Sequence, residues 1–427
     1  MLVNIPWIFI IFARSHTISI TTIMRNKITL SVKHFGPITN AEVTFNRITT
    51  FVGPQGSGKS TLAKLYSMFL WIEKRLERGL VTEKRVTQSM RFQKVYCGYH
   101  RLSSYFYNDT EIIFSGYAYT FTYRDKDLEI LKNDNQEESK VVKVMYVPAE
   151  RNFLSSIGNL SDFKNLPLAL QTFKDEYDSA IQKYASGFHL PLNNVRFEYD
   201  RLNKIPWLVG DGYKVRLSDA SSGFQAALPM LLVSQYLTES VASRNDGSES
   251  RLSIAEQERL NQRVKSVIEN TNISPEVRNA ALAVISSQFN YSGFVNVVEE
   301  PEENLYPESQ KEVLYMLLRL ANIEEDNRLV LTTHSPYIIN YLTLAIKAGR
   351  LKDTANGNEG ILGSINSIVN IGSCISAEDV NIYEMADGSA RLLEMPGGLP
   401  TDNNFLNRAL YDVNTMFDSL LDIEEDM

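Results

Sequence analysis

The segment GPQGSGKS, residues 53–60, constrains the fold most strongly. It follows an alternating, β-branched run at 25–52 and precedes a helical pattern at 61–78. This spacing and context match the phosphate loop G-x-x-x-x-G-K-[S/T]. Its glycines let successive backbone N–H groups face an anion, and the helix N-terminus adds its positive dipole end. We therefore expect a nucleotide's phosphates to bind at Gly53, Pro54, Gln55, Gly56, Ser57, Gly58, Lys59, Ser60 and Thr61.

Two side chains of this loop carry specific chemistry. Lys59 supplies a mobile positive charge for the β- and γ-phosphates of ATP. Ser60 supplies a hydroxyl ligand for Mg²⁺.

A second pattern, VVEEPEENLYP at 297–307, reads as a strand that ends in adjacent carboxylates. Successive strand side chains point in opposite directions, so the two carboxylates are expected to face different partners. We expect Glu299 to face the metal, through water, and Glu300 to position or deprotonate the water that attacks the γ-phosphate. The alternative is an acidic surface loop.

Two further patterns are interpreted together with the phosphate loop and the carboxylate pair. His334, in LTTHSP at the end of the next strand, can reach the γ-phosphate, although a lone histidine can also be a structural hydrogen-bonding group. Ser221, Ser222 and Gly223 begin a helix, which by itself is no more than a helix cap. As a second helix end directed at phosphate, they are what a dimeric ATPase needs to close each nucleotide from the opposite subunit.

The pattern of elements predicts an α/β fold. After Phe294 the order is strand, helix, strand, helix, which indicates a parallel sheet flanked by helices behind a β-rich N-terminal lobe. We expect a P-loop ATPase head at 24–395, with inserted segments at 79–145 and 244–292. Residues 396–427 are predicted to form a C-terminal helix with an acidic tail.

Composition limits the partners. The net charge of -8 argues against a chain that coats nucleic acid over its whole surface. Residues 73–101 are locally basic, which indicates either a solvated helix face or a contact for nucleic acid or an acidic partner. The pair Cys97 and Cys374 suggests neither a metal knuckle nor a disulfide framework, so a reducing cytoplasm is expected.

The N-terminus is apolar over residues 1–13, which is short of the ~20 residues that span a bilayer. We interpret 1–23 as an upstream extension outside the fold, with Met24 as the natural start. A hydrophobic anchor or an extra docked helix is the alternative. No stable membrane association is expected.

Taken together, GPQGSGKST, PAER, SSGFQ, EEPEENLYP and TTHSP resemble the AAA-type ATPases with ATP-binding-cassette heads. These include the overcoming-lysogenization-defect (OLD) family and the SMC-like repair ATPases, and the resemblance covers about residues 25–395. It implies that Lys59 and Ser60 bind nucleotide and Mg²⁺, that Glu300 is the catalytic carboxylate and that His334 is the switch histidine. It also implies that Ser222 with Gly223 forms the signature contact across a dimer.

Some positions depart from the family pattern. Gln55 stands where Asn is common and Glu299 where Asp is common, and both keep their chemistry. Phe224 replaces the second glycine of a transporter-type signature and argues against a transporter subunit. The loop glutamine of such heads has no evident equivalent. Glu150 and Arg151 occupy the comparable place after a strand, where they do related work or form a buried ion pair.

The resemblance also implies a biological role. OLD nucleases continue into a Toprim domain, and the stretch after Glu384 is too short for one, so a separate effector such as a nuclease is expected. We expect an oligomeric ATP switch in anti-phage defence or DNA maintenance. The alternative is an ATP-bound sensor that does not hydrolyse and that recognises nucleic acid or a foreign protein. A transporter ATPase subunit is the least favoured hypothesis.

Overall fold

The structure is a computed structural model. It describes residues 27–133, 140–157, 166–245, 254–269, 277–278, 281, 290–425 and 427. The predicted extension at 1–23 lies outside the described residues, as does much of the predicted insertion at 244–292.

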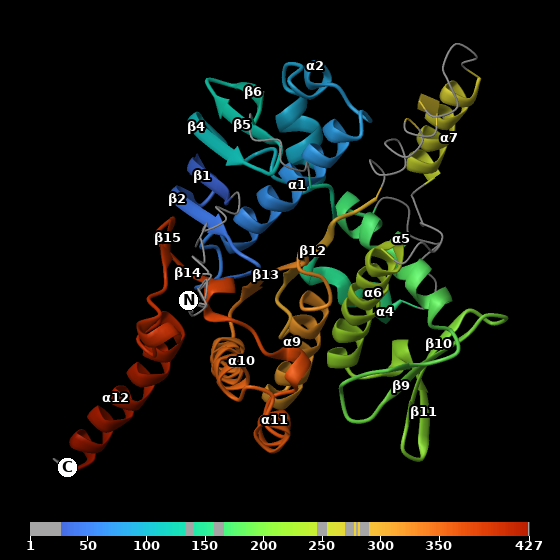
Figure 1. Ribbon diagram of the computed structural model, residues 1–427. Coiled ribbons are helices and arrows are strands. Elements are labelled where there is room, and N and C mark those ends of the chain that lie inside the picture. The colour runs from blue at the N-terminus through green and yellow to red at the C-terminus, as the bar shows by residue number, and fades with distance from the viewer. Residues whose placement is uncertain are drawn as a thin grey trace, which may run out of the picture.

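One large sheet organises the described part of the chain (Figure 1). Its 11 strands run in the order β6-β5-β4-β1-β2-β15-β14-β3-β13-β12-β7. The strands are β1 (Ile28–Phe35), β2 (Ile38–Phe45), β3 (Ile48–Val52), β4 (Phe106–Ser115), β5 (Tyr119–Arg124), β6 (Asp127–Lys132), β7 (Val142–Val147), β12 (Gly293–Glu299), β13 (Arg328–Thr333), β14 (Val380–Ala386) and β15 (Ser389–Leu392).

The sheet has two parts of different character. Strands β14, β3, β13, β12 and β7 are parallel neighbours, whereas β2, β1, β4, β5 and β6 form an antiparallel lobe. The predicted α/β fold, with a β-rich N-terminal lobe and a parallel core, is thereby confirmed. The segment 79–145 contributes to both parts, because β4–β6 extend the lobe beyond β1 and β7 is the edge strand of the parallel core.

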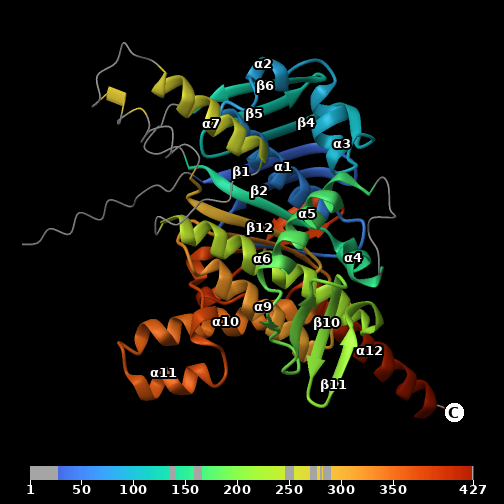
Figure 2. The same ribbon diagram turned by 90° about the vertical axis from the view of Figure 1, so that its right-hand side faces the viewer.

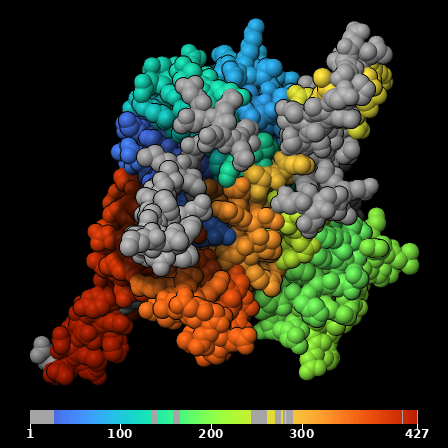
Figure 3. Space-filling model, in the orientation of Figure 1, coloured from blue at the N-terminus to red at the C-terminus, as the bar shows by residue number. Residues whose placement is uncertain are grey.

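Helices cover both faces of the parallel strands. Successive residues of β12 enter different cores. Val297 packs with α1 (Lys59–Glu77), and Val298 packs on the other face with α6 (Ser222–Asn245), α9 (Pro307–Ala321) and α10 (Pro336–Thr354). Figures 1 and 2 show α1 on one side of β12 and β13 and the other three helices on the opposite side. The remaining α-helices of the described residues are α2 (Glu83–Val86), α3 (Cys97–Tyr99), α4 (Phe153–Ser156), α5 (Leu168–Lys183), α7 (Ile254–Ile268), α11 (Glu359–Asn366) and α12 (Phe405–Glu425). Helix α12 extends away from the body at the lower left of Figures 1 and 3.

A second, four-stranded antiparallel sheet lies beside α5 and α6, in the order β11-β10-β9-β8. Its strands are β8 (Phe188–His189), β9 (Arg196–Asp200), β10 (Ile205–Gly210) and β11 (Tyr213–Arg216). Within the described residues, no helix is long and apolar enough to cross a bilayer. Both cysteines are buried and free.

Candidate nucleotide-binding and catalytic site

The phosphate loop joins β3 to α1 and needs its glycines for geometric reasons. Gly53, Gly56 and Gly58 have φ values of 147°, 74° and 99°, a region that side chains disfavour. A Cβ atom on Gly53 would lie 2.3 Å from the carbonyl oxygen of Met385, and one on Gly58 would lie 2.8 Å from Cγ1 of Ile38. The loop backbone is therefore fixed by its packing against β14 and β2.

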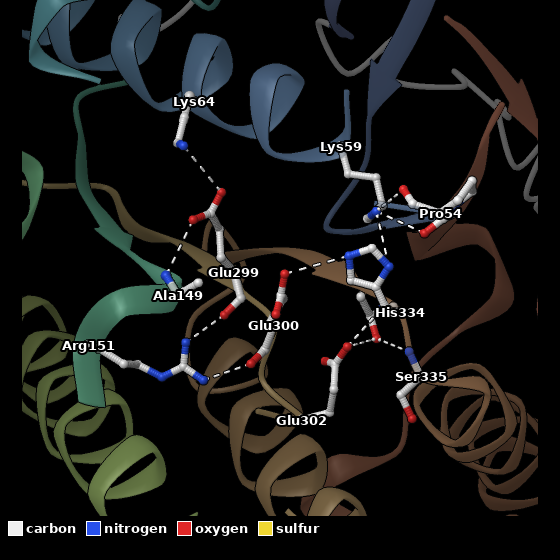
Figure 4. A network of polar contacts seen from close by, with 12 residues as sticks. Pro54, Lys59, Lys64, Ala149, Arg151, Glu299, Glu300, Glu302, His334 and Ser335 are labelled. Carbon is white, nitrogen blue, oxygen red and sulfur yellow. Dashed lines mark hydrogen bonds and ion pairs between the residues drawn. The ribbon is translucent and has the colours of Figure 1, made fainter. Parts of the chain in front are cut away.

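Lys59, at the start of α1, points back into this loop (Figure 4). Its Nζ donates to the carbonyl oxygens of Gly53 and Pro54, each at 2.8 Å, and lies 3.4 Å from Nδ1 of His334. Burial lowers the pKa of Lys59 to about 8, while the nearby carboxylates, Glu300 foremost, act in the opposite direction. The Lys59 ammonium group therefore lies next to the loop backbone that is expected to bind phosphate.

Glu299 ends β12 and is buried below α1. Its Oε2 accepts a hydrogen bond from the backbone N of Ala149 at 3.3 Å, and its Oε1 lies 3.7 Å from Nζ of Lys64. Lys64 follows Ser60 by one helical turn, so the carboxylate faces the same side of α1 as the Ser60 position. Among the described residues Oε1 has no hydrogen-bond partner.

Glu300 points elsewhere, because the chain turns sharply here. Its φ is 44°, and its backbone N donates to the carbonyl oxygen of Thr332 at 2.9 Å, which ties the turn to β13. Its carboxylate is partly exposed and lies 3.6 Å from Nε2 of His334. Figure 4 shows Glu299 directed toward Lys64 and Glu300 directed toward His334.

His334 follows β13 and lies between Lys59 and Glu300 (Figure 4). Burial and the Lys59 charge lower the pKa of His334, and Glu300 partly offsets them. An ammonium donates and cannot accept, so Nδ1 accepts from Lys59 and Nε2 of the neutral ring carries its hydrogen toward Glu300.

Glu302 holds this histidine in place, a role that the sequence did not reveal. Its Oε1 accepts from the backbone N of His334 and from Oγ1 of Thr333, each at 2.7 Å. Burial raises the pKa of Glu302. The second acidic pair in EEPEE is evident in the sequence, but the sequence does not show whether a carboxylate in a turn is solvated or buried.

The buried Arg151 side chain holds the turn that follows β12, residues 299–304, which is called the acidic turn below. Its guanidinium donates to the carbonyl oxygens of Glu299 and Glu300, each at 2.7 Å, and of Ala226 at 3.0 Å and Pro148 at 3.2 Å. It also lies 3.5 Å from Oε2 of Glu303. The predicted buried ion pair between Glu150 and Arg151 is therefore wrong, because the Glu150 side chain is exposed and the carboxylate beside Arg151 belongs to Glu303.

The residues that begin α6 pack against the same acidic turn from another side. Ser221 and Ser222 are exposed, whereas Gly223 is buried. A Cβ atom on Gly223 would lie 2.8 Å from the carbonyl oxygen of Asn304, so only glycine allows this approach. The structure therefore places this helix end next to the acidic turn, and its role across a dimer stays a prediction.

The hydroxyl and carboxylate groups at the phosphate loop are suited to bind a nucleotide together with Mg²⁺. Ser57, within the loop, has a buried Oγ atom without a hydrogen-bond partner among the described residues. The Ser60 hydroxyl and the Glu299 carboxylate are hard oxygen ligands of the kind that Mg²⁺ prefers. Within the described part of the chain, no group of three or more His, Cys, Asp or Glu side chains could hold a metal ion by itself.

Comparison with protein families finds a match that covers a short segment of the chain. The model of the family described as AAA ATPase domain matches residues 280–339, which contain the acidic turn and His334. No curated protein matches the chain by sequence.

Solved structures similar to the chain include an SMC head domain from Thermotoga maritima, at 10% identity and a TM-score of 0.33, covering 86% of this chain and 98% of that one. The recombination mediator RecF of the RecFOR pathway has 10% identity and a TM-score of 0.31, with coverages of 86% and 99%. The ATP-binding cassette MJ0796, in a dimer bound to ADP and phosphate, has 10% identity and a TM-score of 0.25, with coverages of 86% and 98%. The fold assignment rests on the strand order and on the phosphate loop, not on these superpositions.

Proposed function

We propose that the protein is a Mg²⁺-dependent ATPase that works as a switch. The observation that carries the proposal is the juxtaposition of Lys59, His334 and Glu300, which come from α1, the end of β13 and the end of β12. Three separate elements thus converge beside a loop whose backbone suits phosphate.

Each residue has a defined task in this proposal. Residues 53–61 hold the triphosphate, with Lys59 leaving its carbonyl partners to contact the β- and γ-phosphates. Ser60 and Glu299 would hold Mg²⁺, which neutralises phosphate charge when bound. The Glu300 carboxylate orients the attacking water and accepts its proton. The Nε2–H group of His334, which faces Glu300 in the structure, turns to donate to the γ-phosphate when nucleotide is bound.

The switch needs a second copy of the chain. Ser221, Ser222 and Gly223 of one copy would contact the γ-phosphate held by the other, so that ATP favours a closed dimer and hydrolysis opens it. The exposure of Ser222 and the contact of Gly223 with the acidic turn support this arrangement. The family resemblance supports a separate effector, such as a nuclease, in anti-phage defence.

The test compares two variants with the parent protein. The Glu300→Gln variant should still bind ATP, but its rate of phosphate release should fall by roughly 100-fold or more. It should therefore accumulate as a nucleotide-bound oligomer. Lys59→Ala should lose ATP binding. Glu308→Gln, an exposed carboxylate on α9 paired with Lys311, is the matched control and should resemble the parent.

The measurements are phosphate release and nucleotide affinity. Parent-like hydrolysis by Glu300→Gln would contradict the assignment of Glu300. Tight ATP binding by a parent protein that releases no phosphate, with or without duplex DNA, would support the sensor hypothesis instead.

A further inference from the structure

The Glu299 carboxylate is buried but incompletely paired. Its side chain is 5% exposed, and its Oε2 accepts a hydrogen bond from the backbone N of Ala149 at 3.3 Å. Its Oε1 has no hydrogen-bond partner among the described residues. Burial removes a carboxylate from water, so such a group needs hydrogen-bond donors or a nearby positive charge. The positive charge beside Glu299 therefore decides how readily this carboxylate can take another cation.

Lys64 supplies that charge from α1. Its Nζ lies 3.7 Å from Oε1 of Glu299, which is within the range of an ion pair but too long for a good hydrogen bond. Figure 4 shows the Lys64 side chain pointing from α1 toward Glu299. The Lys64 side chain is 26% exposed and has a flexible four-carbon stem, so its ammonium can move toward water while α1 stays in place.

The other groups around the Lys64 ammonium are neutral rings. Nζ of Lys64 lies 5.9 Å from the centroid of the Tyr146 ring on β7, a contact that attracts a cation weakly. Burial and, to a smaller extent, the Lys64 charge lower the pKa of His100 to about 3, so this ring is uncharged. Among the described residues, Glu299 is the carboxylate within ion-pair distance of Lys64. The two charges thus compensate each other.

Lys64 and a bound Mg²⁺ ion would need the same carboxylate. Lys64 follows Ser60 by one turn of α1, so both side chains leave the helix on the side that faces Glu299. The Ser60 hydroxyl and the Glu299 carboxylate are the oxygen groups expected to hold the metal. An ammonium beside that carboxylate repels a divalent cation, and it compensates the carboxylate charge when no metal is bound.

We propose that Lys64 is the counter-ion of Glu299 in the metal-free site and that its ammonium competes with Mg²⁺ for this carboxylate. Lys64 thereby sets the Mg²⁺ concentration at which the site takes up the metal. It keeps the metal affinity low until the phosphates of a nucleotide add their own oxygen ligands, so nucleotide and metal bind together. This inference rests on the proposed function, because it concerns the metal site of the same ATPase.

The first experiment measures ADP affinity by isothermal titration at a series of Mg²⁺ concentrations. The quantity compared is the Mg²⁺ concentration that gives half of the full gain in ADP affinity. Lys64→Met removes the charge and should lower this concentration by roughly tenfold, the scale on which groups around metal ligands change metal affinity. Lys64→Arg keeps the charge and should resemble the parent protein.

Lys143→Met is the matched control. Nζ of Lys143 lies 2.6 Å from Oε1 of Glu176, and the two side chains are 20% and 22% exposed. This substitution also removes the lysine partner of a carboxylate, but Glu176 belongs to α5 and lies outside the phosphate loop and the acidic turn. The Mg²⁺ concentration needed for ADP binding should therefore stay at the parent value.

The failure of this inference can be told apart from the failure of the proposed function. An unchanged Mg²⁺ requirement in folded Lys64→Met, or an equal change in Lys64→Met and Lys64→Arg, would overturn the inference alone. Weaker ADP binding by Lys64→Met at every Mg²⁺ concentration would also overturn it, because Lys64 would then contact phosphate. An ADP affinity of the parent protein that does not depend on Mg²⁺ would contradict the proposed function itself.

The second experiment follows thermal unfolding with Mg²⁺ alone, without nucleotide. Lys64→Met leaves a buried carboxylate without its counter-charge, so the unfolding midpoint should fall, and Mg²⁺ should restore part of the loss. The combination of Lys64→Met and Glu299→Gln removes both charges, so it should be more stable than Lys64→Met and should not respond to Mg²⁺. If Lys64→Met alone does not fold, recovery of folding by the added Glu299→Gln would support the pairing. A combined variant that is no more stable than Lys64→Met, or that responds equally to Mg²⁺, would overturn it.

Discussion

Replacing Arg151 with methionine tests how the acidic turn is held. The guanidinium is fully buried and donates to four backbone carbonyl oxygens, two of which belong to Glu299 and Glu300. Hydrogen bonds from a charged donor contribute about 1.5–3 kcal/mol each, and the substitution also removes the cost of burying the charge, which is several kcal/mol. We expect a net loss of about 3 kcal/mol in the free energy of unfolding.

Urea unfolding measures that loss, and Arg124→Met is the matched control. The Arg124 guanidinium is exposed and pairs with Glu111 on the lobe, so its removal should leave the unfolding midpoint unchanged. Phosphate release, measured at a temperature where the Arg151 variant is folded, should also fall, because the turn that directs Glu300 is no longer held. A free energy of unfolding within 1 kcal/mol of the parent value, or parent-like turnover by the destabilised variant, would refute the bracing role.

Two other predictions follow from local geometry. Gly53→Ala should abolish nucleotide binding, since the new Cβ atom would meet the Met385 carbonyl oxygen; isothermal titration with ATP checks this, and parent-like affinity would show that the loop can move. Burial raises the pKa of Glu73 on α1 to about 7, despite hydrogen bonds from the backbone N atoms of Ala118 and Tyr119. The folded state then holds a proton that the unfolded chain has released, so stability should fall by at most about 3 kcal/mol as pH rises from about 4.5 to 7. Glu73→Gln should flatten that part of the pH profile of thermal unfolding, and an unchanged slope would contradict the assignment.

The sequence by itself determined the phosphate loop and the kind of sheet around it. The pattern at 53–60 requires a strand before it and a helix after it, and β3 and α1 are found there. The alternation of strands and helices after Phe294 likewise predicted β12, α9, β13 and α10, because such connections force parallel pairing. These features are local, since periodicity and turn chemistry act over a few residues.

Only the tertiary structure decided which polar groups are partners. Glu302 and Lys64 look like ordinary surface residues in the sequence, and the sequence does not give the partners of Arg151. The order of strands in the sheet brings all three side chains to the acidic turn or to His334. Burial changes what these charges do, because a charged group removed from water must be paired or neutralised. Burial depends on the order of strands in the sheet, which no short pattern encodes.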